Sequence, residues 1–192
     1  MALPADYEHE AGHPAPWFQH HEGPWTLEEV LALPDDPSQR VELVDGALLV
    51  SPLGTGRHQL LVGDFYAALR QACPPGYEAM PGINVGLSGG RLLIPDFTVN
   101  AAGFRGLLLP VQDLLLAGEV LSPSTRLQDL VLKKKLYAEA GVPFYLVVDP
   151  KGGEPVATLF EIDGIEYVET ARSAGGVLKL ERPFPVTIEL SL

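Results

Sequence analysis

The chain has 192 residues, a length that suits one compact domain with a sizeable core. No apolar stretch reaches the roughly 18 residues that a bilayer-spanning helix requires, so we expect no membrane association. The formal net charge of −12 argues against a general nucleic-acid binder, because phosphate contacts need lysine and arginine, but it leaves room for a nuclease with a locally basic cleft. The single cysteine, Cys73, excludes an internal disulfide framework. Since the acidic, polar N-terminus also differs from a signal peptide, we expect a cytoplasmic protein.

Residues 1–24 are predicted to form a solvated arm, because four prolines break any helix there and no hydrophobic periodicity is present. The arm contains four histidines, namely His9, His13, His20 and His21. Metal binding by these histidines is the lesser alternative, since no regular ligand pattern accompanies them. Residues 25–192 are predicted to form a single domain, because no repeat or linker divides them.

The first elements of this domain are indicated by cap and turn residues. Thr26-Leu27-Glu28-Glu29 has the spacing of a capping box, which predicts a short helix that ends near Leu33. Asp45-Gly46 separates two apolar runs and predicts a β-hairpin over 41–50. A longer helix is expected over 57–72.

The rest of the chain is predicted to be rich in strands, with one further helix. That helix runs from about Arg126 to Ala140 and is ended by Gly141 and Pro143. The expected strands are 78–87, 91–100, 117–122, 144–148, 157–162, 166–171 (after a turn at Asp163-Gly164) and 186–190. This combination predicts a mixed α/β (α+β) fold.

Two acidic residues interrupt apolar runs that are typical of buried strands: Asp96 within 91–100 and Glu119 within 117–122. Burying an unpaired carboxylate costs several kcal/mol or makes it neutralise. A shared divalent cation is the strongest reason for two such carboxylates, because hard cations prefer carboxylate oxygens. A lysine-bearing helix follows directly. Two acids and a lysine on a strand–strand–helix frame are typical of metal-dependent nucleases.

A helical wheel separates the lysines of that helix. Asp129, Lys133 and Tyr137 share the face that must pack on the sheet, whereas Lys135 points to water. Asp129 lies four residues before Lys133 and can hold it in position. A helical salt bridge beside the core is the simple alternative. The nearby Asp96 and Glu119 favour instead a lysine that orients and stabilises an attacking hydroxide.

Two further residues each allow two interpretations. His58 lies in the centre of an apolar helical stripe, which is more typical of a core histidine, although it could contact the site from one end of the helix. Glu42 alternates with apolar neighbours, so it is either an outward strand residue or a third carboxylate near the metals. The hydroxyls of Ser122-Pro123-Ser124-Thr125 are natural N-caps, and no His–Asp relay accompanies them to make a nucleophile.

Several short motifs are spread from residue 42 to residue 150. They are Glu42-Leu43-Val44-Asp45-Gly46, His58, Pro95-Asp96, Glu119-Val120-Leu121-Ser122-Pro123-Ser124-Thr125, Asp129, Lys133, Tyr137, Gly141-Val142 and Val148-Asp149-Pro150. With them the chain resembles the Uma-type restriction endonucleases, of the PD-(D/E)XK or restriction-endonuclease-like superfamily. The resemblance covers most of the chain, from about Thr26 to Pro150 and beyond.

The resemblance implies a mixed sheet flanked by helices and hydrolysis of phosphodiesters with a divalent metal. It makes Asp96 the first acid of the motif and Glu119 the second. The lysine position two residues after Glu119 holds Leu121 here, so Lys133 on the helix is the matching lysine. Relatives often carry Glu and Trp at the positions of Phe144 and Leu146, which we interpret as structural.

From these observations we expect Mg²⁺ or Mn²⁺ bound by Asp96, Glu119 and the Val120 carbonyl. The expected function is a DNA endonuclease in which Lys133 orients the nucleophile and Glu42, His58, Asp129 and Tyr137 are accessory. A non-catalytic interaction module that retains the nuclease fold is the rival interpretation. A two-fold homodimer is also expected, with the strand edges of 157–192 and the apolar segment 184–188 as candidate interfaces. The alternative is that these strands only extend the monomer's own sheet.

Overall fold

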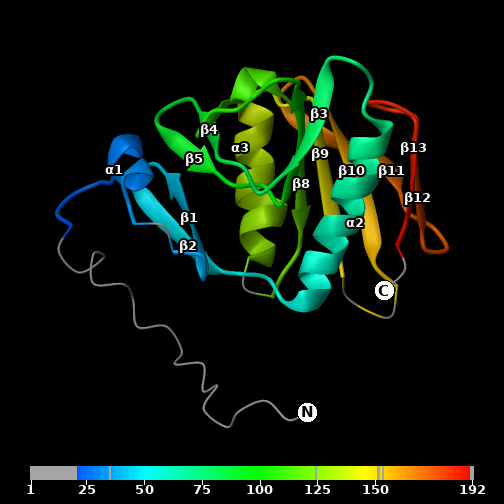
Figure 1. Cartoon of the computed structure of the whole chain (residues 1–192), viewed down its shortest axis with the longest axis horizontal. Helices are drawn as coiled ribbons and strands as arrows, with labels where there is room; N and C mark the ends of the chain where they lie inside the picture. Colours follow the sequence, from blue (N-terminus) through cyan, green and yellow to red (C-terminus); the bar gives the residue numbers. More distant parts are fainter. Residues whose placement is uncertain (1–20, 35, 124, 151, 153, 191–192) are drawn as a thin grey trace, which may run out of the picture.

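The structure is a computed structural model that describes residues 21–34, 36–123, 125–150, 152 and 154–190 (Figure 1). Its helical elements are α1 (Leu27–Leu31), α2 (Gly56–Ala72), the 3-10 turn η2 (Val111–Asp113), the π-helix η3 (Gln128–Lys133) and α3 (Lys134–Glu139). Its strands are β1 (Gln39–Val44), β2 (Ala47–Pro52), β3 (Tyr77–Pro81), β4 (Val85–Leu87), β5 (Arg91–Leu93), β6 (Phe97–Ala101), β7 (Leu109–Pro110), β8 (Leu114–Val120), β9 (Phe144–Asp149), β10 (Val156–Asp163), β11 (Glu166–Arg172), β12 (Val177–Leu180) and β13 (Val186–Glu189).

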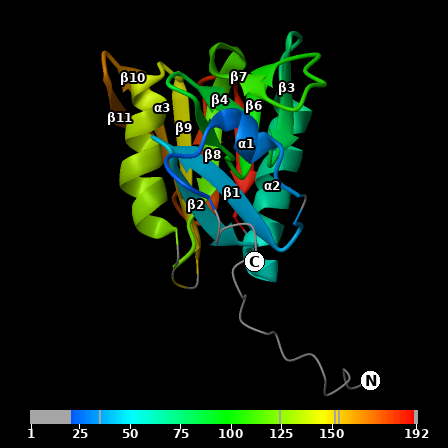
Figure 2. The ribbon, with the colours of Figure 1, turned by 90° about the vertical axis from the view of Figure 1, so that its left-hand side faces the viewer.

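A six-stranded sheet in the order β11-β10-β9-β8-β6-β3 forms the centre of the molecule. Strands β8 and β9 are parallel, and the other neighbours are antiparallel. Helix α2 covers one face and helix α3 the other (Figure 2). Along β9, Leu146 and Val148 pack with α2, whereas Tyr145 and Val147 pack with α3, because successive strand residues point to opposite faces. The predicted mixed sheet flanked by helices is confirmed.

A second sheet, in the order β2-β1-β5-β4-β7, lies beside the first and carries α1 (Figure 2). Leu43 of β1 is the register partner of Leu92 of β5, and both side chains are buried together with Val30 of α1. This small core attaches the N-terminal elements to the strand that precedes Asp96. It therefore fixes the position of β1 relative to the central sheet.

Several local predictions are confirmed. Thr26 and Glu29 form the capping box at the start of α1. The β1–β2 hairpin turns at Asp45 and Gly46, whose φ angles of 50° and 81° fit a type I′ turn. The long helix predicted over 57–72 is α2, which begins one residue earlier.

Two segments predicted as continuous strands are each divided into two strands, because the chain passes from one sheet to the other within them. The segment 78–87 is divided into β3 of the central sheet and β4 of the second sheet, and 91–100 is divided into β5 and β6 in the same way. Pro95 lacks an N–H for a strand ladder and favours a break at that point. Asp96 consequently lies just before β6 rather than inside a continuous strand.

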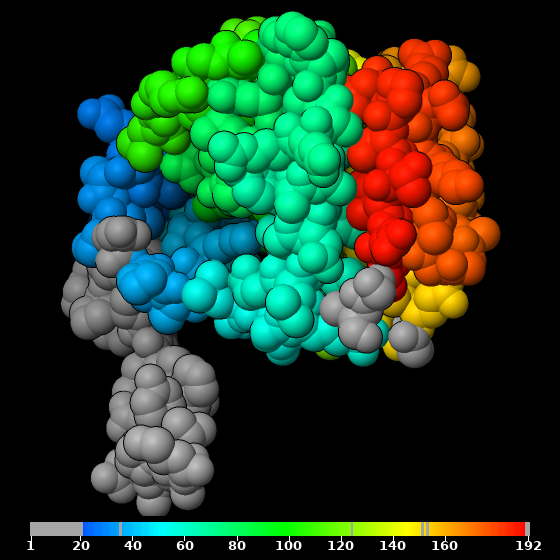
Figure 3. Space-filling model, turned by 45° about the vertical axis from the view of Figure 1, so that its right-hand side comes forward, coloured from blue at the N-terminus to red at the C-terminus, as the bar shows by residue number. Residues whose placement is uncertain are grey.

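The C-terminal strands also differ from expectation. The turn at Asp163-Gly164 joins β10 to β11 as predicted, but β12 and β13 form a separate two-stranded sheet beside α2 (Figure 3). Phe184 and Ile188 are buried in the core that α2 shares with the central sheet. These two large side chains of the candidate interface segment 184–188 are therefore used by the monomer itself, whereas Pro185 and Thr187 are exposed.

Of the predicted N-terminal arm, residues 1–20, with His9, His13 and His20, lie outside the described residues. His21 stacks on Trp25 with ring centroids 3.6 Å apart, and its Nε2 lies 3.4 Å from Glu29. The Trp25 N–H donates to the Gly46 carbonyl at 2.9 Å, which ties this segment to the β1–β2 turn. Among the described residues, no helix is long and apolar enough to cross a membrane.

Candidate active site

Asp96 is placed at the point where the chain crosses from the second sheet to the central sheet, and its side chain is only 3% exposed. Its Oδ2 accepts a hydrogen bond from the Val120 N–H at 2.8 Å and lies 3.2 Å from His58 Nε2. Its Oδ1 forms an ion pair with the Arg40 guanidinium. The carboxylate is therefore oriented from three sides, by β1, α2 and β8.

Glu119 is brought close to Asp96 by the pairing of β6 with β8. Phe97, which follows Asp96, is the register partner of Gly118, which precedes Glu119. Ala117 of β8 and Leu121 just after its end pack on the α3 side, so Glu119, which alternates with them, faces α3 as well. There its Oε1 lies 3.1 Å from Lys133 Nζ. Glu119 is 2% exposed, so this contact is fully enclosed.

Lys133 is the centre of a buried carboxylate cluster. Its Nζ lies 3.0 Å from Glu42, 3.1 Å from Glu119 and 3.3 Å from Asp129. The predicted pairing with Asp129 is thus confirmed. The lysine lies at the end of the π-helical segment η3, which the sequence did not predict. Such a segment widens a turn of the helix and often occurs at functional sites.

The other lysines of this helix point elsewhere, in agreement with the helical wheel. Lys135 is 72% exposed and lies 3.7 Å from Glu139. Lys134 Nζ lies 3.4 Å from the centroid of the Phe160 ring. Lys133 is therefore the lysine of this helix that faces the carboxylates.

Of the two interpretations of Glu42, the structure shows the inward one. Glu42 is buried, and besides its contact with Lys133 its Oε1 accepts a hydrogen bond from the Ile94 N–H at 2.7 Å. His58 is also buried, but its Nε2 faces Asp96 rather than the apolar core. A Cβ at Gly54 would lie 2.3 Å from His58 Nδ1, so the imidazole rests on the Gly54 backbone.

Asp129, besides its contact with Lys133, is bound to the wall behind the cluster, and Tyr137 belongs to this wall. Asp129 Oδ2 accepts a hydrogen bond from the Thr125 hydroxyl at 2.7 Å, and its backbone carbonyl accepts one from the Tyr145 hydroxyl at 2.8 Å. The rings of Tyr137 and Tyr145 lie 5.5 Å apart. The buried Tyr137 hydroxyl has no hydrogen-bond partner in the described part of the chain. Tyr137 thus lies in the apolar packing beside the site.

Arg40 is the site residue that the sequence analysis missed. It lies two positions before Glu42 on β1, and residues two apart on a strand share a face. The inward position of Glu42 therefore carries Arg40 towards Asp96. The alternation alone could not reveal this, since it does not show which face of β1 is buried.

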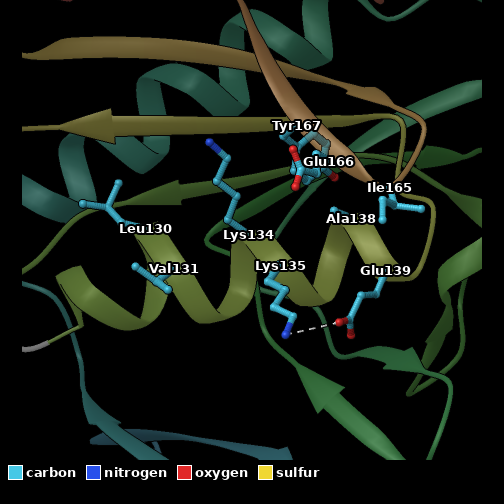
Figure 4. A pocket seen from close by; sticks show the side chains of 9 residues that line it. All are labelled: Leu130, Val131, Lys134, Lys135, Ala138, Glu139, Ile165, Glu166 and Tyr167. Carbon is cyan, nitrogen blue, oxygen red and sulfur yellow. Dashed lines mark ion pairs between the residues drawn. The ribbon is translucent and has the colours of Figure 1, made fainter.

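These side chains line a small cavity of about 30 Å³, enough for a water molecule or a cation. The lining residues are Arg40, Ser51, Pro52, Gly54, His58, Asp96, Glu119, Val120, Ser122, Thr125, Asp129 and Lys133. A larger hollow of about 610 Å³ lies on the outer face of the lysine helix, between residues 130–139 and 165–167 (Figure 4). It contains the Lys135–Glu139 pair but none of the clustered carboxylates, so we place the site at the smaller cavity.

The cavity holds more carboxyl groups than cationic side chains. The four carboxyl groups of Asp96, Glu119, Glu42 and Asp129 meet two permanent cations, Arg40 and Lys133, so the fully ionised cluster would have two negative charges in excess. Burial raises the pKa of Glu119 well above its ordinary value, and the charge of Lys133 offsets this only in part. Burial likewise raises the pKa of Glu42, against the opposing charge of Lys133.

Asp96 differs from the other acids. Burial alone would raise its pKa, but the hydrogen bond from His58 and the charge of Arg40 outweigh that effect and hold the pKa below its ordinary value. Asp96 is therefore the carboxylate that these contacts keep ionised.

The residues present fit a divalent cation in number and charge. Mg²⁺ is commonly held by one or two carboxylates together with water, and its two positive charges would balance the excess of the fully ionised cluster. Within the described residues, no three His, Cys, Asp or Glu side chains form a ready-made ligand group. The carboxylates turn to Arg40 and Lys133 instead, so a cation would have to compete with these two side chains.

The fold and cluster can now be compared with known proteins. A family model, Uma2, described as "Putative restriction endonuclease", matches residues 27–192. The chain belongs to the Uma2 family. The resemblance found in the sequence is thereby confirmed, and Uma2 membership together with the fold supports a nuclease function.

A solved structure has a similar fold. It is described as a "putative nuclease belonging to DUF820 from Anabaena variabilis ATCC 29413", with a TM-score of 0.65 and 17% identity, over 83% of this Uma2 chain and 90% of that chain. At this identity the likeness shows the fold alone. No curated protein matches the chain.

Proposed function

We propose that this chain is a divalent-metal-dependent endonuclease that hydrolyses phosphodiester bonds of DNA. The observation that carries the proposal is the buried cluster in which Asp96 and Glu119 flank one cavity that holds four carboxyl groups and two cationic side chains. A buried excess of negative charge is costly unless a cation balances it. Because the chain belongs to the Uma2 family, a nucleic acid is the substrate class with which this site should be tested.

Asp96, Glu119 and the Val120 carbonyl would hold the cation, Mg²⁺ or Mn²⁺. The Val120 N–H points to Asp96, and the N–H and C=O of a strand residue point to the same side of the strand. The Val120 carbonyl is thus directed towards the Asp96 side of β8. A cation bound there would act as a Lewis acid, which lowers the pKa of water and neutralises charge on the phosphate.

The chain's own residues would hold and orient the reactants. Arg40 and His58 fix the direction of the Asp96 carboxylate. Lys133 holds Glu119, Glu42 and Asp129 together. One of its three N–H groups would turn from its carboxylate partner to the attacking water and orient it. The Glu42 carboxylate, anchored by the Ile94 N–H, would keep Lys133 directed into the cavity.

Cleavage assays test the proposed activity. Plasmid and single-stranded DNA are incubated with the purified chain in Mg²⁺ and in Mn²⁺, with RNA as a parallel substrate. We expect cleavage of DNA that EDTA abolishes and that Lys133→Ala lowers by at least about a hundredfold. Lys179→Ala is the matched control, because Lys179 is exposed on β12, outside the cavity. Cleavage by Lys133→Ala at the wild-type rate would indicate a contaminating nuclease or a wrong site.

The second candidate function is a non-catalytic interaction module that retains the nuclease fold. Two observations favour it: Leu121 occupies the usual lysine position of the motif, and the chain is strongly acidic. A chain that binds Mn²⁺ and nucleic acid but leaves every substrate intact would support this alternative.

We also propose that the chain assembles as a homodimer. Because the monomer already buries Phe184 and Ile188, we place the interface elsewhere. The hollow of Figure 4 exposes Val131 (58%) and Ile165 (82%), with Lys135 and Glu139 at its rim. A two-fold axis through this hollow would set the lysine of one chain against the glutamate of the other.

A further inference from the structure

The two cations of the cavity differ in how many N–H donors they have left for a substrate. Lys133 has three N–H groups, and three carboxylates lie within 3.3 Å of its Nζ. It is only 4% exposed. Even if one donor turns to the attacking water, Lys133 has none to spare for an incoming phosphate.

Arg40 has the opposite properties. Its guanidinium carries five N–H groups, and Asp96 is its one side-chain partner in the described part of the chain. Its side chain is 23% exposed. Arg40 therefore has cationic N–H groups left that can donate hydrogen bonds to an anion at this cavity.

The free N–H groups of Arg40 lie where the site cavity meets a larger groove. Arg40 lines the site cavity and also a groove of about 550 Å³ between α1 and the strands β1 and β5, with Gly82 in its wall. Its Nη1 contacts Asp96, while Nη2 points towards Gly82, where a Cβ would come within 3.9 Å of it. One end of the guanidinium thus faces the acid and the other faces the groove.

A phosphodiester that approaches four carboxylates meets repulsion unless a cation receives its oxygens. We propose that Arg40 binds the scissile phosphate, donating its second N–H pair to the non-bridging oxygens at the junction of cavity and groove. The planar fork of arginine suits phosphate oxygens and can contact Asp96 at the same time. This inference rests on the proposed nuclease function and identifies the residue through which the site recognises its substrate.

The proposal separates Arg40 from a residue that only positions Asp96. If Arg40 only oriented the Asp96 carboxylate, loss of Arg40 would weaken metal binding. The affinity for DNA would then depend on other residues and would not change directly. If Arg40 binds the phosphate, its loss weakens DNA binding, while Asp96 stays oriented by His58 and the Val120 N–H. Metal binding would then persist or strengthen, because one competitor for Asp96 is gone.

The test measures binding of fluorescent single-stranded and duplex DNA by anisotropy in Ca²⁺, with gels that show the DNA remains intact. Arg40→Met should raise the Kd by about tenfold or more and reduce the slope of log Kd against log salt by about one. Arg40→Lys should restore the slope but only part of the affinity, because lysine lacks the fork. Arg105→Met is the control, since Arg105 pairs with Glu78 beyond the other end of β6.

A calorimetric titration with Mn²⁺ accompanies each variant, and circular dichroism verifies its fold. Unchanged DNA affinity and salt slope in Arg40→Met, in a chain whose wild type cleaves DNA, would overturn the Arg40 proposal and leave the nuclease proposal intact. Loss of Mn²⁺ binding together with DNA binding would also overturn it, in favour of a positioning residue. Loss of DNA binding in Arg40→Met with a wild type that binds but never cleaves would support the phosphate contact and reject the nuclease. A wild type that neither binds nor cleaves nucleic acid would overturn both.

Discussion

The ring of Phe97 occupies the space into which a side chain at Gly118 would project: a Cβ there would lie 1.9 Å from a ring carbon. The two residues are register partners on β6 and β8. Asp96 directly precedes one and Glu119 directly follows the other. The close fit of glycine against the aromatic ring therefore fixes the spacing of the two acids.

Gly118→Ala should destabilise the protein, because the added methyl group overlaps a buried ring that cannot move freely. Overpacking of this kind costs about 1–3 kcal/mol, and we expect the Tm to fall by several degrees. Gly63→Ala is the control, since Gly63 is an exposed position of α2 with nothing within 4 Å of its Cβ position. Thermal melts followed by circular dichroism compare the two. Equal melting of Gly118→Ala and wild type would show that β6 and β8 can separate without cost.

Metal binding should depend on Asp96. We expect Asp96→Ala to lose the calorimetric heat of Mn²⁺ binding, because it removes the carboxylate that its neighbours keep ionised. Asp64→Ala removes an exposed carboxylate of α2 and should titrate like the wild type. A normal Mn²⁺ titration of Asp96→Ala would exclude this residue as a ligand.

Lys133→Met should unfold more easily, because it leaves three buried carboxylates without their cation. Loss of one partner of a buried ion pair costs about 3–5 kcal/mol, so we expect the Tm to fall on the order of 10 °C. Added Mn²⁺ should restore more of the Tm in this variant than in the wild type, since the metal replaces part of the missing charge. Lys135→Met, with an exposed side chain, should melt within about 1 °C of the wild type. A Lys133→Met protein as stable as wild type would mean that the carboxylates are protonated.

Light scattering tests the homodimer. At micromolar concentration we expect twice the chain mass, and Val131→Asp should reduce it to 20.7 kDa by placing a charge in the exposed apolar hollow. Leu60→Asp, an exposed position on α2, is the control and should leave the mass unchanged. A wild-type mass of 20.7 kDa would rule out the dimer at that concentration.

Much of the local structure is determined by the sequence alone. The Thr26–Glu29 capping box and the Asp45-Gly46 turn depend on contacts within a few residues, and both are present. Asp96 and Glu119 could be selected because a charge within an apolar run requires a partner wherever the run is buried. Lys133 could be selected because the helical wheel places it on the face that packs on the sheet. The pairing of Asp129 with Lys133 follows from helical spacing in the same way.

Only the tertiary structure decides how these groups meet. Alternation along β1 is the same whether Glu42 faces water or the core, and packing against β5 and the lysine helix selects the core. That choice also carries Arg40 to Asp96, which no local signal shows. The change of sheet at Pro95 depends on which strands are available to pair. The sequence by itself therefore determined which residues need a partner, whereas long-range packing decided which partners they have, because those contacts join segments far apart in the chain.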